Sequence, residues 1–312
     1  MRIGIDFGGT NVKFGLFEEN GTTNKFSVKK LVELKSSNNL LLFNLLEETK
    51  KFIGDEKISC GGLSIKGLVN RKTGALINDI GAANEFAGVN LQKIFSEKLS
   101  TPFVIDNDAR AYAFGEWRFG TGRNFDSVIV MTLGTGVGCA AVIDGKLFGS
   151  ENPTSGVLGG HISIDRNGDE CACGSRGCLE LYCSASAFEK KVLNTFPELN
   201  EKETPLKIFF DESEKNSEYK ILLEEFRENL AIGIINIIHA YGIDKIILGG
   251  GLMKSHEKII PGLIEIVRRR AWTVPKGNVE ILPAQLEDKA ACIGAAFLDR
   301  SSFTYSRNIN ER

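Results

Sequence analysis

Two glycine-rich turns, each between two apolar segments, constrain the fold of this chain most strongly. The first lies within residues 3–17 and the second within residues 128–145. Both segments predict a strand, a tight turn and a second strand. The turn residues are Gly8, Gly9 and Thr10 in the first segment and Gly134, Thr135 and Gly136 in the second. Because the two segments look like versions of one design, the sequence indicates two related structural units.

Turns of this composition have two interpretations. Glycine lets backbone N–H groups approach an anion closely, and a threonine hydroxyl adds a donor, so two such turns facing each other would hold a polyphosphate between two domains. Alternatively, the glycines only permit tight hairpins, and a short glycine motif often matches by chance. The chain has no G-x-x-x-x-G-K-[ST] loop, and residues 134–139 fail the G-x-G-x-x-G spacing at Cys139. The presence of two turns favours the phosphate interpretation.

A cluster of metal-ligand residue types follows the second turn. His161 precedes Cys171, Cys173 and Cys178, which lie in a short segment with glycines, and Glu180 comes just after it. One imidazole and three thiolates are the ligands of a closed tetrahedral zinc site. Two interpretations stay open: a purely structural zinc, and a zinc loop that also presents Glu180 to a ligand.

Composition limits the partners and the compartment. With 312 residues, 42% of them hydrophobic, the chain is long enough for one large or two medium domains. A formal net charge of −2 argues against nucleic acid and anionic membranes as partners. The apolar residues 230–240 are too few to span a bilayer, and residues 2–6 read as a strand rather than a signal peptide. Seven cysteines, three of them in the metal-type cluster, indicate a reducing compartment, so we expect a cytoplasmic protein.

The remaining patterns alternate between strands and helices. Helical spacing marks residues 38–53, 91–99, 109–117, 185–193 and 219–240, and buried strands are expected at residues 58–65, 103–105 and 245–248. The polar residues 200–217 are expected to form a loop or a loosely ordered helix start. Residues 289–298 predict a helix of small residues that crosses back to the first domain. This alternation predicts an α/β architecture.

Together these motifs resemble the ROK family of sugar kinases and sugar-responsive repressors. The motifs are residues 6–11, Asn107-Asp108-Ala109, residues 133–138, the His161 cluster with Glu180, and residues 248–251. The resemblance covers nearly the whole chain and implies a two-domain actin/hexokinase-type ATPase fold, with duplicated ribonuclease H-like units and a zinc knuckle. The expected domains are an N-terminal α/β domain at residues 1–117, on which a C-terminal helix at residues 289–312 packs back, and a larger C-terminal α/β domain with the zinc knuckle at residues 118–288.

The resemblance implies an ATP-dependent sugar kinase that transfers the γ-phosphate to a hydroxyl of a hexose or a related sugar. Glucokinase- or hexokinase-like activity is the expectation, with fructokinase and N-acetylmannosamine kinase as related cases. Asp108 would be the general base, since phosphoryl transfer uses an acidic side chain that orients or deprotonates the attacking hydroxyl. Its position between a strand and a helix is also typical of an ordinary N-cap.

The resemblance also implies the binding residues and the cofactors ATP, Mg²⁺ and Zn²⁺. The implied nucleotide-binding residues are Asp6, Gly8, Gly9, Thr10, Lys13, Gly134, Thr135, Gly136, Gly250 and Gly251. The implied sugar-binding residues are Gly67, Asn84, Asn107, Asp108, His161 and Glu180, and the zinc ligands are His161, Cys171, Cys173 and Cys178. Asp6 would act near Mg²⁺ through water, because this cation keeps several waters; alternatively it is a polar strand end. Lys13 either supports the first turn or is solvated.

One position departs from the family pattern. Leu158 stands where the family has a glutamate, three residues before the knuckle histidine, that binds the sugar. An apolar side chain cannot accept a hydrogen bond from a sugar hydroxyl, and Lys66 also stands where the family often has proline. We therefore expect a different hexose, a substituted sugar or a related polyol as the substrate.

Three alternative functions fit parts of the pattern. A repressor of this family needs a helix-turn-helix ahead of the first strand, and residue 3 already begins that strand. An ATPase or an acyl-phosphate-forming kinase fits less well, because the knuckle and Asn107-Asp108 favour a sugar. A non-catalytic or regulatory sugar-binding ROK protein is suggested by Leu158. The expected partner is a small sugar, and the family implies a homodimer or a homotetramer.

Overall fold

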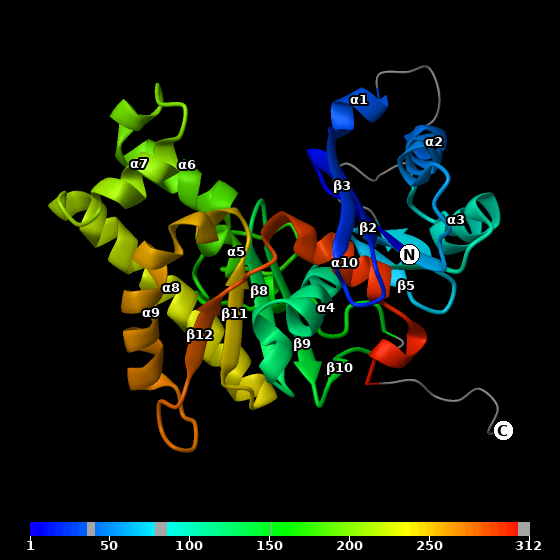
Figure 1. Ribbon diagram of the computed structural model, residues 1–312. Helices are drawn as coiled ribbons and strands as arrows, with labels where there is room; N and C mark the ends of the chain where they lie inside the picture. The colour runs from blue at the N-terminus through cyan, green and yellow to red at the C-terminus, as the bar shows by residue number, and fades with distance from the viewer. Residues whose placement is uncertain (36–40, 79–85, 151, 305–312) are drawn as a thin grey trace. The chain divides into compact units, whose positions relative to one another are not determined.

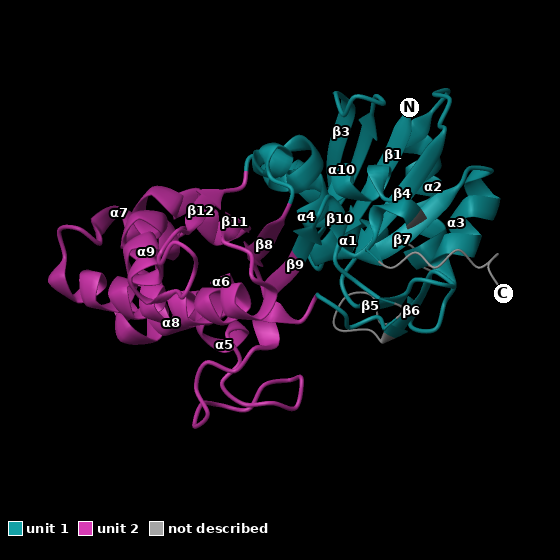
Figure 2. Ribbon diagram, turned by 90° about the horizontal axis from the view of Figure 1, so that it is seen from below, with its two compact units in different colours: residues 1–126, 141–156, 285–312 teal, residues 127–140, 157–284 magenta. Residues whose placement is uncertain are grey.

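The computed structural model describes residues 1–35, 41–78, 86–150 and 152–304 (Figure 1). It divides into two compact units, which Figure 2 shows in different colours. The first unit comprises residues 1–126, 141–156 and 285–312, and the second comprises residues 127–140 and 157–284. Each unit has its own strands and helices, as the alternating sequence pattern predicts.

A five-stranded sheet forms the centre of the first unit, with the strand order β3-β2-β1-β4-β7. The strands are β1 (Arg2–Phe7), β2 (Asn11–Phe17), β3 (Thr23–Lys30), β4 (Cys60–Ile65) and β7 (Phe103–Asn107). Strands β1, β2 and β3 pair antiparallel, whereas β4 pairs parallel with both β1 and β7. The parallel arrangement brings the carboxyl ends of β1, β4 and β7 to one edge of the sheet, where a ligand site is expected in α/β proteins.

Helices and a small hairpin complete the first unit. They are α1 (Leu31–Lys35), α2 (Leu41–Ile53), α3 (Leu91–Leu99), α4 (Asp108–Phe119) and α10 (Ala290–Phe297), with β5 (Leu68–Asn70) paired to β6 (Ala75–Asn78). Every residue of α10 is buried, and this helix contacts α4, β1 and β4. Its alanines and glycine are small, so the neighbouring elements can pack closely around it.

The second sheet repeats the pattern of the first, with the strand order β10-β9-β8-β11-β12. Its strands are β8 (Val128–Leu133), β9 (Val137–Ile143), β10 (Lys146–Leu147), β11 (Lys245–Gly249) and β12 (Glu280–Pro283). In this sheet β11 pairs parallel with both β8 and β12, as β4 does with β1 and β7 in the first sheet. Two sheets with the same strand order confirm the predicted α/β fold with duplicated units.

The helices of the second unit are α5 (Glu180–Cys183), α6 (Ala185–Thr195), α7 (Pro205–Glu212), α8 (Ser217–Tyr241) and α9 (His256–Arg270). Helix α7 lies within residues 200–217, where the sequence predicts a loop or a loosely ordered helix start. Pro205 occupies its first turn, and Phe209 and Phe210 pack against Phe188 of α6, which explains why this polar segment is helical. None of the described helices combines the length and the apolar character needed to cross a membrane.

Candidate functional site

A row of polar side chains crosses the first sheet close to its carboxyl edge. The register places Asp6 of β1 beside Lys13 of β2 and Ser64 of β4, and it places Ser64 beside Asp106 of β7. Ser64 Oγ donates a hydrogen bond of 2.9 Å to Asp6 Oδ1, and Lys13 Nζ lies 3.6 Å from Asp6 Oδ2. Lys13 Nζ also donates to Asp288 at 2.8 Å. Lys13 is therefore an ion-pair partner of Asp6 rather than a solvated side chain.

Burial disfavours the charged form of Asp6. It raises the pKa of Asp6 overall, and the charge of Lys13 and the hydroxyl of Ser64 counteract only part of that effect. Burial lowers the pKa of Lys13, but the nearby carboxylates Asp6 and Asp288 outweigh it and raise that pKa overall. Asp6 is only 8% exposed, so a cation that approaches it would meet a carboxylate with few competing waters.

The β7–α4 junction presents Asp108 at the start of a helix. Asn107, rather than Asp108, caps α4: its Oδ1 accepts from Ala109 N at 3.0 Å and from Arg110 N at 3.4 Å. Asn107 Nδ2 donates to Asp108 Oδ1 at 3.0 Å and to the Gly67 carbonyl at 3.1 Å. The cap role that the sequence allowed for Asp108 thus belongs to its neighbour. Direct contact of Asn107 with a sugar stays a prediction.

The environment of Asp108 shifts its proton affinity into the range that general bases use. Burial raises the pKa of Asp108 to about 6, and the charge of Asp6 adds to this shift. The Ala109 N–H and the positive charge of Lys66 counteract part of it. A carboxyl group that titrates near pH 6 can accept a proton at neutral pH more readily than an ordinary aspartate.

Of two further residues predicted to bind the sugar, the structure describes Gly67 but not Asn84. Gly67 lies beside Asn107 and contributes its carbonyl oxygen to that side chain. Asn84 lies outside the described residues. Lys66, which the sequence marked as a departure from the family pattern, acts on Asp108 through its charge.

The first glycine turn links β1 and β2 with part of its surface open. Gly8 N–H donates to Asn11 O at 3.0 Å, which closes the turn. Gly9 and Thr10 are exposed, and the Thr10 carbonyl accepts from Leu31 N at 2.8 Å. The backbone and the hydroxyl of this turn are therefore accessible to a ligand, as the phosphate interpretation requires.

The second glycine turn links β8 and β9 and is fixed by residues that follow the knuckle. Gly134 N–H donates to Gly136 O at 3.0 Å within the turn. The Gly134 carbonyl accepts from Ala185 N at 2.7 Å, and Val137 N donates to Glu180 Oε2 at 2.9 Å. Glu180 thus contacts the turn directly, a relationship that the sequence did not indicate.

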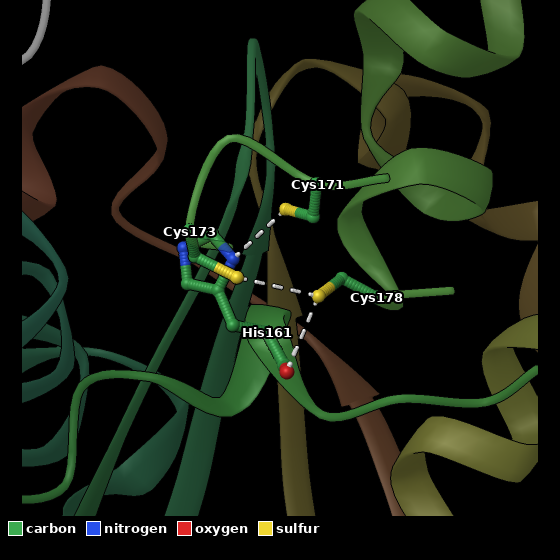
Figure 3. Close-up of side chains that lie close together, drawn as sticks. All are labelled: His161, Cys171, Cys173 and Cys178. Carbon is green, nitrogen blue, oxygen red and sulfur yellow. Dashed lines mark hydrogen bonds between the residues drawn. The ribbon is translucent and has the colours of Figure 1, made fainter. Parts of the chain in front are cut away.

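The four predicted metal ligands converge in the second unit, as Figure 3 shows. Their ligand atoms all lie within 4.8 Å of one another. Cys171 Sγ lies 3.6 Å from His161 Nδ1, and Cys173 Sγ lies 3.6 Å from Cys178 Sγ. Ligands placed tetrahedrally at about 2.0–2.3 Å from zinc are separated by roughly 3.5–3.8 Å. The residue types and the spacing both fit a structural Zn²⁺ ion.

Local structure brings the ends of this knuckle together. His161 ends the 3₁₀ helix η3 (Gly159–His161), and Leu179 N donates to Ile162 O at 2.9 Å. Cys178 Sγ lies 3.4 Å from the His161 carbonyl. Leu158, which directly precedes η3, keeps 43% of its surface exposed, so it is available for contact with a ligand.

A pocket of about 590 Å³ lies beside the turn that follows β11. Gly251 and Ala185 line it together with Leu206, Phe210 and Leu252. Its volume lies within the range of small-molecule sites, about 300–1,000 Å³. Gly250, with φ of 90°, directly precedes this wall and contacts Leu133 at the end of β8. Of the predicted nucleotide-binding residues of the second unit, Gly251 therefore lines a cavity of suitable size and Gly250 precedes it, whereas the Gly134–Thr135–Gly136 turn does not line it.

Comparison with known proteins decides the family. The model of the ROK family matches residues 2–301. The chain belongs to the ROK family.

The relatives that are similar in sequence include both repressors and kinases. A xylose repressor of Bacillus subtilis (strain 168) is 28% identical over 234 residues, which cover 75% of this chain and 59% of the repressor. The glucokinase of Thermotoga maritima is 26% identical over 305 residues, which cover 94% of this chain and 95% of that enzyme.

A solved ROK structure supports the same relationship. The ROK family glucokinase from Streptomyces griseus, in complex with glucose and AMPPNP, superposes with a TM-score of 0.77 at 26% identity. The match covers 96% of this chain and 99% of the enzyme. The ROK chain described here therefore has the same fold as that enzyme.

Several residues near the candidate site were not predicted from this ROK sequence. Ser64 hydrogen-bonds Asp6, and Arg110 forms a buried ion pair with Asp106, the residue before Asn107. The four-residue spacing of Asp106 and Arg110 did not indicate the pair, because Asp106 lies in β7 and only Arg110 lies in α4. No local pattern indicated Ser64, because its partner depends on the register of two strands that are distant in sequence.

Proposed function

We propose that this protein is an ATP-dependent sugar kinase in which Asp108 is the general base. The observation that supports this most is the half-buried Asp108 carboxyl, held by Asn107 at the start of α4, with a pKa raised to about 6. Phosphoryl transfer needs little covalent chemistry from the protein beyond positioning, charge stabilisation and a base for the attacking hydroxyl. Asp108 has the position and the proton affinity for that base.

In the proposed reaction, Asp108 orients a sugar hydroxyl and accepts its proton. Asn107 Nδ2 and Ala109 N both donate to Asp108 Oδ1, so they fix the orientation of the carboxylate. Its second oxygen is then the acceptor for the substrate. ATP, when bound, supplies the transferable phosphoryl group, and Asp6 would hold Mg²⁺ through water, as this cation prefers.

The second unit would bind the nucleotide. The Gly134–Thr135–Gly136 turn, in which Thr135 is exposed, has the composition of an anion-binding turn. Gly251 lines the cavity of about 590 Å³. The apolar side chains Leu206, Phe210 and Leu252 line that cavity and would contact a base. The first turn, with Gly8, Gly9 and Thr10, would contribute further donors to phosphate.

The sugar would be selected by His161, Glu180 and the group at position 158. The comparisons with glucokinases support a hexose as the substrate class. Leu158 offers an exposed apolar surface rather than a hydrogen-bond acceptor. We therefore propose a sugar with an apolar substituent, or one lacking the corresponding hydroxyl, because a polar group left without a partner is selected against.

A second candidate is a non-catalytic or regulatory sugar-binding protein. The similarity to the xylose repressor favours it, and so does Leu158. Such a protein would bind a sugar without consuming ATP. Asp108 separates the two candidates, because sugar binding alone does not require a base with a raised pKa.

A coupled assay of ATP consumption over hexoses, hexosamines, deoxysugars and polyols tests the proposal. The kinase predicts turnover with at least one of these sugars, together with formation of a sugar phosphate detectable by mass spectrometry. Sugar binding by calorimetry without ATP consumption for any bound sugar would favour the regulatory candidate and contradict the kinase.

A further inference from the structure

Val137, the first residue of β9, lies between two residues that adjoin the metal ligands. On one side, its N–H donates to Glu180 Oε2 at 2.9 Å, and Glu180 is two residues after Cys178. On the other side, its carbonyl group contacts Gly160, the residue before His161. The side chain of Val137 is only 5% exposed. Both ends of the knuckle therefore reach the same residue at the end of the second glycine turn.

Neither contact leaves room for a side chain. A Cβ atom on Gly160 would overlap the Val137 carbonyl oxygen, and a Cβ atom on Gly136 would overlap Glu180 Oε2. Gly160 is required by its close approach to backbone, whereas at Gly136 a side chain would displace the carboxylate of Glu180 from Val137. The knuckle and the turn therefore form one packed structure. A displacement of Glu180 or Gly160 would have to move Val137 or leave its N–H without a partner.

The chain segment between Cys178 and Ala185 also contacts the first residue of the second glycine turn. Ala185 N donates to the Gly134 carbonyl at 2.7 Å, and Ser184, which caps α6, immediately precedes Ala185. The chain between Cys178 and Ala185 thus contacts both Gly134 and Val137. The position of this chain segment is tied to the metal ligand Cys178.

We propose that zinc binding at the knuckle orders the Gly134–Thr135–Gly136 turn and thereby increases affinity for a nucleoside triphosphate. This inference rests on the proposed kinase function and adds a role for the metal in nucleotide binding. Glu180 is the positioning residue: its Oε2 holds Val137. Among the described residues none donates a hydrogen bond to its Oε1, which leaves that atom for the sugar contact predicted from the sequence.

The physical basis is the free energy that a structural zinc contributes to its surroundings. Zinc bound to His161 and Cys178 fixes their backbones, since structural zinc binding is coupled to local folding. Their neighbours Gly160 and Glu180 are then held on opposite sides of Val137. Anion-binding turns work by presenting N–H groups in a fixed orientation, so a more ordered turn binds phosphate more tightly.

Hydrogen exchange, measured without any nucleotide, tests whether zinc orders the Gly134–Thr135–Gly136 turn. We expect the peptide covering residues 132–139 to exchange at least about tenfold faster in zinc-stripped protein, the effect of losing a hydrogen bond to a charged group. Glu180→Leu should show the same increase while it retains zinc, whereas Glu180→Gln, whose amide oxygen still accepts from Val137 N, should stay within about twofold of wild type. The control Arg176→Gln alters an exposed knuckle residue whose ion-pair partner is the likewise exposed Glu170. Unchanged exchange after zinc removal and in Glu180→Leu would overturn the proposal.

Calorimetric titration with AMPPNP in the absence of sugar tests the consequence. Zinc-stripped protein and Glu180→Leu should bind about tenfold more weakly than wild type, and Glu180→Gln and Arg176→Gln should bind nearly as tightly. Equal AMPPNP affinity in all forms would overturn the inference and leave the kinase function standing. No binding of AMPPNP to the zinc-loaded wild type would overturn the kinase function and, with it, the nucleotide role of the metal.

Discussion

Arg110, which has no exposed surface, donates from Nη1 to Asp106 Oδ1 at 2.9 Å. Its Nη2 also donates to the carbonyl groups of Pro153 and Ser155, at 3.0 and 2.6 Å. Asp106 in turn accepts from Asn107 N at 2.7 Å. This buried ion pair therefore connects the β7–α4 junction, which presents Asp108, to the loop after β10.

We expect Arg110→Met to lower the free energy of unfolding by up to about 3–5 kcal/mol, because it removes the fully buried cation that pairs with Asp106. The Asp106 carboxylate then keeps only the Asn107 N–H and the longer ion pair with Arg71, whose Nε lies 3.4 Å from Asp106 Oδ2. Urea denaturation of the variant measures this loss. The double variant Asp106→Asn with Arg110→Met should recover part of it, since both charges are then removed. A loss below about 1 kcal/mol in Arg110→Met would show that the pair is not maintained in solution.

The raised pKa of Asp108 predicts a pH-dependent stability difference. A carboxyl group whose pKa rises from 3.8 to about 6 on folding destabilises the folded state wherever it is ionised, that is, above about pH 6. We expect Asp108→Asn to raise the free energy of unfolding by about 1–3 kcal/mol at pH 8. The difference should shrink as the pH falls from about 6 to about 4. An equal stability difference between Asp108→Asn and the wild type at pH 8 and at about pH 4 would argue against the raised pKa of Asp108.

Leu158 provides a test of substrate selection. We compare the kcat/KM for glucose with the kcat/KM for the sugar that the wild type uses best. We expect Leu158→Glu to raise the ratio of these two values by about tenfold or more, because the carboxylate restores a hydrogen-bond acceptor. Leu158→Met is the matched control, since it keeps an apolar side chain. The position is 43% exposed, so neither variant should change stability by more than about 0.5 kcal/mol. An unchanged sugar preference in Leu158→Glu would mean that this side chain does not meet the substrate.

The knuckle provides a test of the metal. Cys173→Ser should lose zinc, because one of the four ligands is removed, and should bind sugar more weakly, since His161 is then free to move. Elemental analysis measures the zinc, and calorimetry measures the sugar. Cys60→Ser is the control, because Cys60 lies outside the ligand cluster. Wild-type protein purified without zinc, or full zinc content in Cys173→Ser, would contradict the assignment of these ligands.

Local sequence patterns predicted the elements that depend on neighbours in the chain. The turns around Gly9 and Thr135 lie between strands because glycine and threonine interrupt apolar segments of strand length. The metal cluster was predicted because ligand type and short spacing are sufficient to indicate a zinc site. The alternation of strands and helices predicted the α/β class, and the ROK resemblance added the duplicated units, which the structure and the comparisons confirm.

Relationships between distant segments were not predictable in this way. The neighbours Lys13, Asp6 and Ser64 depend on strand register, which local patterns do not specify. Residues 118–126, 141–156 and 285–288 group with the first unit, although the expected domains placed them in the second. The contact of Glu180 with Val137 likewise depends on tertiary packing around the knuckle.

Turnover of Asp108→Asn tests the central claim most directly, measured with the best sugar at saturating ATP beside the exposed-site control Asp55→Asn. The account predicts that kcat falls by about 10²–10⁴-fold in Asp108→Asn and stays unchanged in Asp55→Asn, with AMPPNP binding and zinc content retained in both. The kcat/KM of the wild type should decrease below about pH 6, where Asp108 becomes protonated. Wild-type turnover in Asp108→Asn would contradict the account.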